Sequence, residues 1–244
     1  MIPVIPPPPL THRFTRHLSL VTNTMLAKKL ENFYFNLKIQ AELPPGIRVM
    51  DPYENPEVRK ICSRFFIRFY KGDNTMKLIL GINPGRFGAG VTGITFTDPV
   101  RLEEACGIKN PFQKKQELSS VFIYQMIEAF GGIRSFYSNY FLSAVSPLGF
   151  IKDGKNLNYY DSRILQEAIT PFILDALNRH IDMGFSRDVV ICLGEGKNHE
   201  FLQKINTEHH LFRDIIPLPH PRWIMQYRYH SRSDYISEYL KVLK

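Results

Sequence analysis

Short apolar runs alternate with longer stretches of helical periodicity along this chain, and this alternation restricts the fold more than any other feature of the sequence. Buried strands are predicted at residues 77–82, 140–145, 189–193 and 214–218. Amphipathic helices are predicted at residues 25–39, 55–70, 118–130 and 233–243, on either side of Pro171, and from Lys197 onwards. Strands separated by more than about a dozen residues need right-handed crossovers, which give a parallel sheet covered on both faces. The predicted class is α/β.

The chain is long enough for one substantial core, with 244 residues of which 44% are hydrophobic. We expect a single domain at residues 25–244. Residues 1–24 contain four successive prolines, Pro6 to Pro9, and show no periodicity, so an extended or disordered leader is predicted there.

The three cysteines lack the spacing of a zinc site or of a disulfide framework, so we expect small buried side chains in a reducing cytoplasm. No apolar stretch reaches the roughly 18 residues that a membrane helix needs, and the sequence shows no export signal. We therefore expect a soluble, cytoplasmic monomer that contacts no membrane. The 31 Lys and Arg residues outnumber the 23 Asp and Glu residues, giving a formal net charge of +8, which favours a polyanionic partner.

Ligands of open parallel sheets bind beyond the carboxyl ends of the strands, so the residues after each predicted strand are the candidates for a site. The first strand is followed by Gly-Ile-Asn-Pro-Gly-Arg-Phe-Gly at residues 81–88, which predicts a tight turn with exposed backbone N–H groups and Asn83 at its apex. Residues 88–93 also match a dinucleotide-binding fingerprint, but the match begins six residues past the strand and no helical pattern follows it. A nucleotide-cofactor enzyme is therefore the weaker alternative.

The other three strand ends also carry polar or flexible residues. Ser143 and Ser146 stand at the end of the second strand, beside a proline turn. After the third strand, Gly194 permits close backbone approach and Lys197 lies at a helix start, where phosphate is favoured. His220 follows the fourth strand between two prolines, whose fixed φ angles hold the imidazole in place as a catalytic group requires.

Residues 222–232 interleave three arginines with aromatic and apolar side chains. Segments of this composition insert wedges into DNA and contact its phosphates, whereas the structural alternative is a packed loop with solvated arginines. If the partner is DNA, the candidate contacts are Gly194, Lys197, Arg222, Trp223 and Arg228.

The motif at residues 81–88, continuing to Thr-Gly-Ile-Thr-Phe at residues 92–96, closely resembles the first active-site motif of the single-strand-selective monofunctional uracil-DNA glycosylases. The His-Pro pair at residues 220–221 resembles their second motif, and the likeness runs in register from about residue 77 to residue 232. The resemblance implies a three-layer α/β/α sandwich with a central four-stranded parallel sheet. It also implies DNA as the partner, no metal, no cofactor, and hydrolysis without a covalent lysine intermediate.

The resemblance implies a role for each matching residue. Asn83 matches the asparagine that positions water, Phe96 the aromatic residue that stacks on the base, and His220 the catalytic histidine. A neutral amide cannot accept a proton efficiently at pH 7, so Asn83 would orient water. His220 would donate to a base carbonyl as negative charge builds on the departing base. The rest of the substrate site is expected at Gly81, Ile82, Pro84, Gly85 and Phe87.

One departure from the family pattern affects specificity. Where these relatives carry His-Asn before the proline turn, with the asparagine reading the pyrimidine edge, this chain has Ser143 and Ala144. Either a hydroxyl of Ser143 or Ser146 replaces the amide, or the preference widens beyond uracil to oxidised pyrimidines or deaminated purines such as xanthine. We expect a monofunctional DNA glycosylase that removes uracil or a related damaged base and leaves an abasic site. The first alternative is a non-catalytic nucleic-acid-binding module on the same fold.

Overall fold

A four-stranded parallel sheet forms the centre of the protein in a computed structural model that describes residues 25–70 and 75–244. The predicted leader at residues 1–24 lies outside the described residues. The sheet has the strand order β3-β2-β6-β7, and all three pairings are parallel. Its strands are β2 (Lys77–Gly81), β3 (Tyr140–Ala144), β6 (Val189–Leu193) and β7 (Asp214–Leu218). The predicted strands and their parallel arrangement are confirmed.

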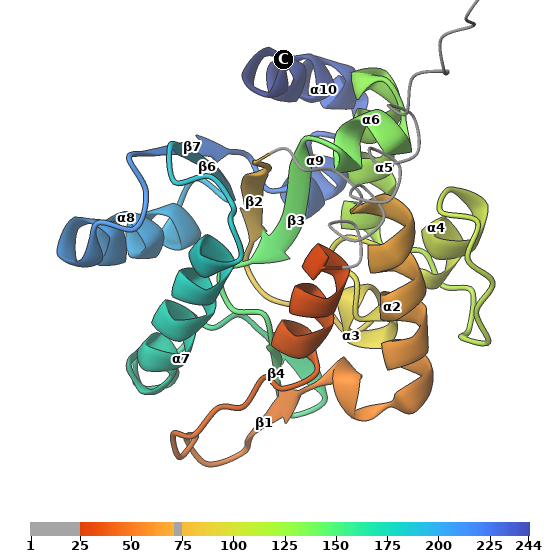
Figure 1. Ribbon diagram of the computed structural model, residues 1–244. Coiled ribbons are helices and arrows are strands. Elements are labelled where there is room, and N and C mark those ends of the chain that lie inside the picture. Colours follow the sequence, from red (N-terminus) through yellow and green to blue (C-terminus); the bar gives the residue numbers. More distant parts are fainter. Residues whose placement is uncertain (1–24, 71–74) are drawn as a thin grey trace, which may run out of the picture.

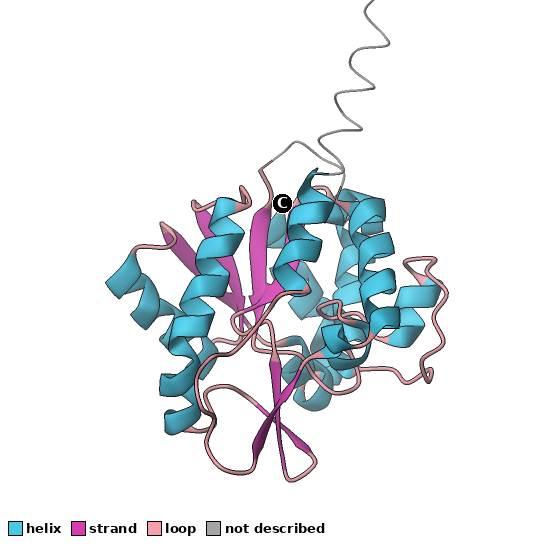
Figure 2. Cartoon of the chain, turned by 60° about the horizontal axis from the view of Figure 1, so that its bottom comes forward, coloured by secondary structure: helices cyan, strands magenta, loops and turns pink. Residues whose placement is uncertain are grey.

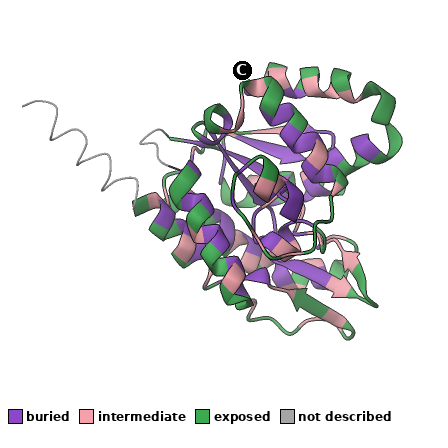
Figure 3. Cartoon of the chain, turned by 90° about the vertical axis from the view of Figure 1, so that its right-hand side faces the viewer, coloured by how far each residue is buried: buried purple, intermediate pink, exposed green. Residues whose placement is uncertain are grey.

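The main sheet is buried on both faces, which explains why its strands are continuous apolar runs instead of alternating ones. Leu78, Leu80, Val190 and Cys192 are completely inaccessible to solvent. Figure 3 shows this buried centre surrounded by helices whose outer sides are exposed.

Helices cover the two faces of the main sheet and complete a three-layer α/β/α sandwich (Figure 1). Alternate residues of a strand point to opposite faces, and β3 shows which helices lie on each. Ser143 contacts Tyr34 of a helix over residues 25–34 and His180 of α7 (Arg163–Asp182). Tyr140 instead donates to the Leu243 carbonyl of α10 (Arg232–Leu243), which packs with α5 (Leu118–Phe130) and α9 (Pro221–Tyr227). The predicted fold class is confirmed.

The remaining helices are all shorter than α7. The longest is α2 (Pro56–Phe69), which begins as predicted, with the Asn55 side chain accepting from the Glu57 N–H and a proline in the first turn. The others are α3 (Ala89–Thr92), α4 (Pro99–Glu104), α6 (Ile133–Tyr137), α8 (Lys197–His209), and the 3-10 helices η1 (Pro52–Glu54) and η2 (Tyr229–Ser231).

α7 is one continuous helix of 20 residues, so the predicted break at Pro171 is wrong. A proline inside a helix removes one backbone hydrogen bond and crowds the carbonyl four residues earlier. Pro171 lies on the exposed side of α7, where water can bond that carbonyl, while Ile169 and Ile173 are completely buried on the inner side. Burial on both sides of the proline keeps the helix intact.

A second, antiparallel sheet of three strands was not predicted. It has the order β1-β4-β5 and contains β1 (Ile47–Met50), β4 (Gly149–Lys152) and β5 (Lys155–Leu157). Asp153 and Gly154 join β4 to β5 with φ values of 50° and 70°, the positive angles of a two-residue hairpin turn. Figure 2 shows this sheet standing apart from the main sheet, beyond its carboxyl edge. The hairpin thereby brings residues after β5 to that edge.

Cys62, Cys106 and Cys192 are free thiols in the interior, as predicted. Within residues 25–70 and 75–244, no helix combines the length and the apolar character needed to cross a bilayer.

Candidate active site

A pocket of about 440 Å³ opens at the carboxyl edge of the main sheet. Its walls come from the turn after β2, the end of β3, the loop before α4, the start of α5, the segment after β5, and α9. Of the residues predicted from the sequence, it brings together Gly81, Ile82, Asn83, Pro84, Gly85, Phe96, His220, Arg222 and Trp223. A volume of this size suits one extruded nucleotide, because small-ligand sites occupy roughly 300 to 1,000 Å³.

Asn83 is held in the pocket by backbone groups of its own turn, of the end of β5 and of the residues that follow β5. Its Oδ1 accepts from the Tyr159 N–H at 3.0 Å, and its Nδ2 donates to the Leu157 carbonyl at 3.3 Å and to the Pro84 carbonyl at 3.4 Å. These contacts fix which end of the amide is the acceptor. A fixed neutral amide can orient a water molecule but cannot act as a strong base.

His220 caps the first turn of α9, and this contact decides which ring nitrogen carries the proton. Its Nδ1 accepts from the Arg222 backbone N–H at 3.1 Å, so the neutral ring carries its hydrogen on Nε2. Burial lowers the pKa of His220 to about 4, and the positive charge of Arg222 acts in the same direction. The imidazole is therefore neutral at pH 7 and presents Nε2–H as a hydrogen-bond donor.

Phe96 forms a wall of the pocket beside His220, with the two ring centroids 6.0 Å apart. Its φ is 54°, a left-handed value that a bulky residue rarely adopts. A Cβ placed on Gly81 would lie 2.7 Å from the Cζ atom of Phe96. Glycine at position 81 therefore leaves the space that the aromatic ring occupies.

Neither of the two serines that were one alternative to the missing amide lines the pocket. Ser143 is completely buried, and its Oγ lies 3.1 Å from the Tyr34 hydroxyl and 3.1 Å from Nε2 of His180, on the opposite face of the sheet. Ser146 is also buried, and its hydroxyl donates to the Leu148 carbonyl at 2.8 Å. Because strand side chains alternate, Ala144 lines the pocket and Ser143 does not.

Phe87 lies outside the pocket, in an adjoining groove of about 370 Å³ that it lines with Arg86, Lys155 and Arg222. Its ring is exposed and lies 3.8 Å from Nζ of Lys115 and 4.8 Å from the guanidinium carbon of Arg86. A π-face flanked by cations is a suitable surface for a nucleotide beside the extruded one.

The residues predicted to contact DNA divide into two groups. Arg222 and Trp223 line the pocket, Trp223 is 39% exposed, and Arg228 lies over its ring at 5.1 Å. Gly194 and Lys197 do not line the pocket. Gly194 has a φ of 117° and packs behind His220, while Lys197 begins α8. The structure thus places Arg222 and Trp223 on the pocket wall, whereas Gly194 and Lys197 lie outside its lining.

The sequence analysis missed the remaining pocket residues: Ala89, Thr95, Glu117, Ser119, Ala144, Asn156, Asn158, Tyr160, Gln226 and Tyr227. Three of them follow from the β4–β5 hairpin, which the Asp153-Gly154 pair between two short runs could have indicated. No sequence pattern marks Glu117, which precedes a predicted helix and resembles an ordinary surface glutamate.

The glycine-rich segment at residues 88–93 does not form a dinucleotide-binding turn. A Cβ on Gly93 would meet Cys62 and Val58 of α2 at 2.7 Å, so this glycine serves close packing of the segment against that helix. The structure therefore offers no support for the nucleotide-cofactor alternative in this segment.

A match to a family model covers most of the chain. The model of the uracil DNA glycosylase superfamily matches residues 68–244, which include every residue that lines the pocket. The chain belongs to this superfamily. It is a DNA glycosylase, a hydrolase of N-glycosyl bonds, and its partner is DNA.

A solved structure is similar to this glycosylase over almost its whole length. The crystal structure of wild-type Pedobacter heparinus SMUG2 matches it with a TM-score of 0.86 and 43% sequence identity, over 89% of this chain and 96% of that chain. Comparison with curated proteins gives no match. In the described ranges of this glycosylase, no group of three or more His, Cys, Asp and Glu side chains is placed to hold a metal ion.

Proposed function

We propose that this glycosylase is monofunctional: it hydrolyses the N-glycosidic bond of uracil or a related damaged base in DNA and leaves an abasic site. One observation carries the proposal. A neutral imidazole with its hydrogen on Nε2 shares a nucleobase-sized pocket with a fixed asparagine amide and an aromatic wall. A base must leave the DNA stack to reach such a pocket.

The proposed reaction divides the work between His220 and Asn83. As the glycosidic bond stretches, positive charge builds on the sugar and negative charge on the departing base. The Nε2–H of His220 would donate to a base carbonyl and stabilise that negative charge, and Phe96 would hold the base by its π-face. Asn83 would orient the attacking water. Among the described residues that line the pocket there is no lysine, in keeping with direct hydrolysis.

We propose that base selection is broad. Ala144 places a methyl group on the wall where the related enzymes carry an asparagine, so no side-chain amide reads the pyrimidine edge from this position. A side-chain amide in the pocket would reject a base that leaves the amide without a hydrogen-bond partner. The methyl group of Ala144 imposes no such cost on other bases. Oxidised pyrimidines and deaminated purines such as xanthine are therefore candidate substrates beside uracil.

We propose that the exposed aromatic residues of α9 fill the space that the extruded base leaves. Trp223 and Tyr227 line the pocket with 39% and 60% of their surface exposed. Apolar or aromatic side chains inserted into a base stack are common where proteins deform DNA. We also propose that the protein is a monomer in a reducing cytoplasm, a compartment that its buried free thiols favour.

The test is a panel of labelled oligonucleotides that carry uracil, hydroxymethyluracil, hypoxanthine or xanthine, each as a single strand and as a duplex. The protein is incubated with each, and alkali then converts abasic sites into strand breaks. The proposal predicts scission for uracil and for at least one further base. Scission for none would instead favour a DNA-binding module without useful activity, and tight binding of a nucleotide cofactor would favour the second alternative.

A further inference from the structure

Glu117 is the sole carboxylate among the described residues that line the pocket. It stands immediately before α5, and its side chain makes no capping bond to that helix. It also lines the adjoining groove with Phe87, so its carboxylate lies between the two cavities. It is an acidic side chain on the wall of a pocket for negatively charged DNA, and an ionisable group with a shifted pKa in such a position is a candidate for a catalytic role.

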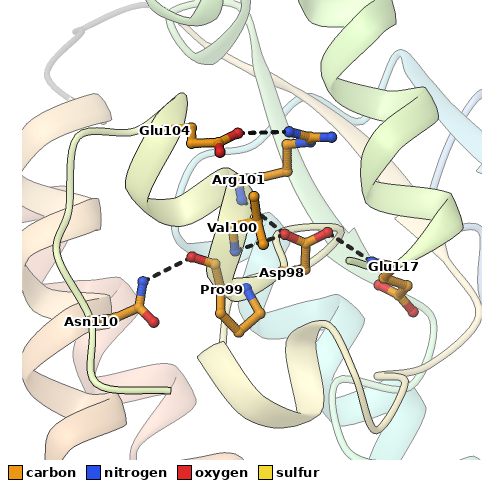
Figure 4. A network of polar contacts seen from close by, with 7 residues as sticks. All are labelled: Asp98, Pro99, Val100, Arg101, Glu104, Asn110 and Glu117. Carbon is orange, nitrogen blue, oxygen red and sulfur yellow. Dashed lines mark hydrogen bonds and ion pairs between the residues drawn. The ribbon is translucent and has the colours of Figure 1, made fainter. Parts of the chain in front are cut away.

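A buried aspartate fixes the position of Glu117. The backbone N–H of Glu117 donates to Oδ2 of Asp98 at 2.8 Å, while Oδ1 of Asp98 accepts from the N–H groups of Val100 and Arg101 at 3.0 and 2.8 Å. Figure 4 shows Asp98 between the first turn of α4 and Glu117. Asp98 is completely buried and stands two residues after Phe96. The wall that carries Phe96 and the carboxylate of Glu117 are thus parts of one rigid network.

The Glu117 carboxylate lies directly against the turn that carries Asn83. A Cβ placed on Gly85 would lie 2.7 Å from its Oε1, and one placed on Gly88 would overlap its Oε2. The two glycines therefore leave room for the carboxylate beside the turn. Ser120 adds one further contact, because its Oγ donates to Oε2 at 3.3 Å.

The surroundings of Glu117 leave it able to exchange a proton near neutral pH. Burial raises its pKa to about 6, and the charge of Asp98 adds to this effect. The Ser120 hydrogen bond and the positive charge of Arg222 act in the opposite direction. Arg86 and Lys155 line the adjoining groove with Glu117, and His220, Tyr160 and Tyr227 line the pocket with it.

The proposed function leaves one proton without an acceptor. A water molecule that bonds to the sugar must lose a proton, yet the Asn83 amide is a poor base and His220 already donates to the departing base. A carboxylate with a raised pKa is the usual solution, since general bases work best when their pKa lies near the operating pH.

We propose that Glu117 is a catalytic residue that accepts the proton of the water attacking C1′ of the sugar, an inference that rests on the proposed hydrolysis. As the bond between C1′ and the base nitrogen breaks, its electron pair leaves with the base. The water oxygen bonds to C1′, and the water proton passes to the Glu117 carboxylate. Glu117 then returns this proton to solvent or to the released base, which leaves a neutral base and an abasic sugar.

The test compares Glu117→Gln with Glu128→Gln, an exposed change in α5. Single-turnover excision of the base that the wild type removes fastest is measured from pH 5 to pH 9. The wild-type rate should fall as the pH drops through about 6, because Glu117 becomes protonated there. Glu117→Gln should be slower by roughly 10²-fold or more and should lack this fall, while it binds DNA containing an abasic site at least as tightly as the wild type. Glu128→Gln should match the wild type.

Adding formate to Glu117→Ala distinguishes the loss of a proton acceptor from a structural effect of the substitution. Formate can enter the space that the side chain leaves and accept the proton, so it should restore part of the rate in Glu117→Ala but none in His220→Ala. A wild-type rate and an unchanged pH profile in Glu117→Gln would overturn this inference while leaving the proposed hydrolysis in place. A wild type that releases no base at any pH would overturn both.

Discussion

At the scale of single residues, the pocket depends on side chains whose orientation the backbone fixes. Asn83 is bonded at both ends of its amide to the segment after β5, and His220 is bonded through Nδ1 to the first turn of α9. The Asn83 amide is thereby held in one orientation, and the contact at Nδ1 leaves the hydrogen of the neutral His220 ring on Nε2. Fixed donors of this kind stabilise a transition state without reorganising at the moment of reaction.

Ala144→Asn tests whether the methyl group on the pocket wall broadens the choice of base. An amide at this position can pair with the pyrimidine edge, and a good bidentate pair is worth about 1–3 kcal/mol. The ratio of the single-turnover rate on uracil to that on the best other base should therefore rise about 10-fold. Ala144→Leu, similar in size but without an amide, is the control. Equal ratios in the two variants would contradict the assignment.

The residues of the two motifs could be predicted from the sequence, because each motif comes directly after an apolar strand that ends in a turn. The sequence was misleading at Ser143, where two adjacent residues of β3 face opposite sides of the sheet and only Ala144 reaches the pocket. Glu117 was missed because its importance comes from contacts with distant segments, namely Asp98 and the glycines of the turn after β2. No local pattern encodes such contacts.

At the scale of secondary structure elements, buried strands were predicted almost to the residue. An uninterrupted apolar run between turn residues has few other interpretations. The errors arose where tertiary packing overrides local preference. α7 continues through Pro171 because its inner side is buried both before and after the proline. The strands of the β4–β5 hairpin are too short to show a clear alternation of apolar and polar residues.

The contact between α7 and β3 predicts a dependence of stability on pH. His180 is completely buried, its Nδ1 lies 2.7 Å from the Ala176 carbonyl, and burial lowers its pKa to about 4. Between pH 6.5 and pH 4 the unfolded chain therefore binds more protons at this residue than the folded chain does. The contribution of His180 to the free energy of unfolding is therefore fully present above pH 6.5 and is lost as the pH falls towards 4. His220 acts in the same direction, and Glu117, whose pKa is raised, acts in the opposite one.

We expect His180→Asn to flatten this dependence. The free energy of unfolding in urea, measured from pH 7 to pH 4.5, should fall by about 2–3 kcal/mol less in the variant than in the wild type, whatever the absolute loss of stability. His209→Asn, an exposed change in α8, should keep the wild-type slope. Identical slopes for wild type and His180→Asn would rule out a neutral, buried His180.

At the scale of the whole molecule, the parallel sheet brings chemistry from distant parts of the sequence to one edge. Asn83 follows β2, Ala144 ends β3 and His220 follows β7, yet all three line one pocket. Basic residues surround this edge, including Arg86, Lys155 and Arg222 in the adjoining groove, in a chain whose formal net charge is +8. Such a surface attracts the phosphate backbone and guides it towards the pocket.

The salt dependence of DNA binding tests this arrangement. Arg228→Ala should weaken binding to undamaged and damaged DNA alike. It should also reduce the slope of log K against log salt concentration by about 0.9 if the guanidinium contacts one phosphate. Arg134→Ala, an exposed change in α6 before the amino end of β3, should leave the slope unchanged. An unchanged slope in Arg228→Ala would exclude that side chain from the phosphate contacts.

The most direct test of the proposed mechanism is the single-turnover excision rate of His220→Ala, measured on the base that the wild type removes fastest. Loss of one donor to the developing negative charge should slow excision by roughly 10²–10³, equivalent to about 3 kcal/mol, while the Kd for DNA stays close to the wild-type value. A rate equal to that of the wild type would show that the imidazole does not stabilise the departing base, and the proposed mechanism would be wrong.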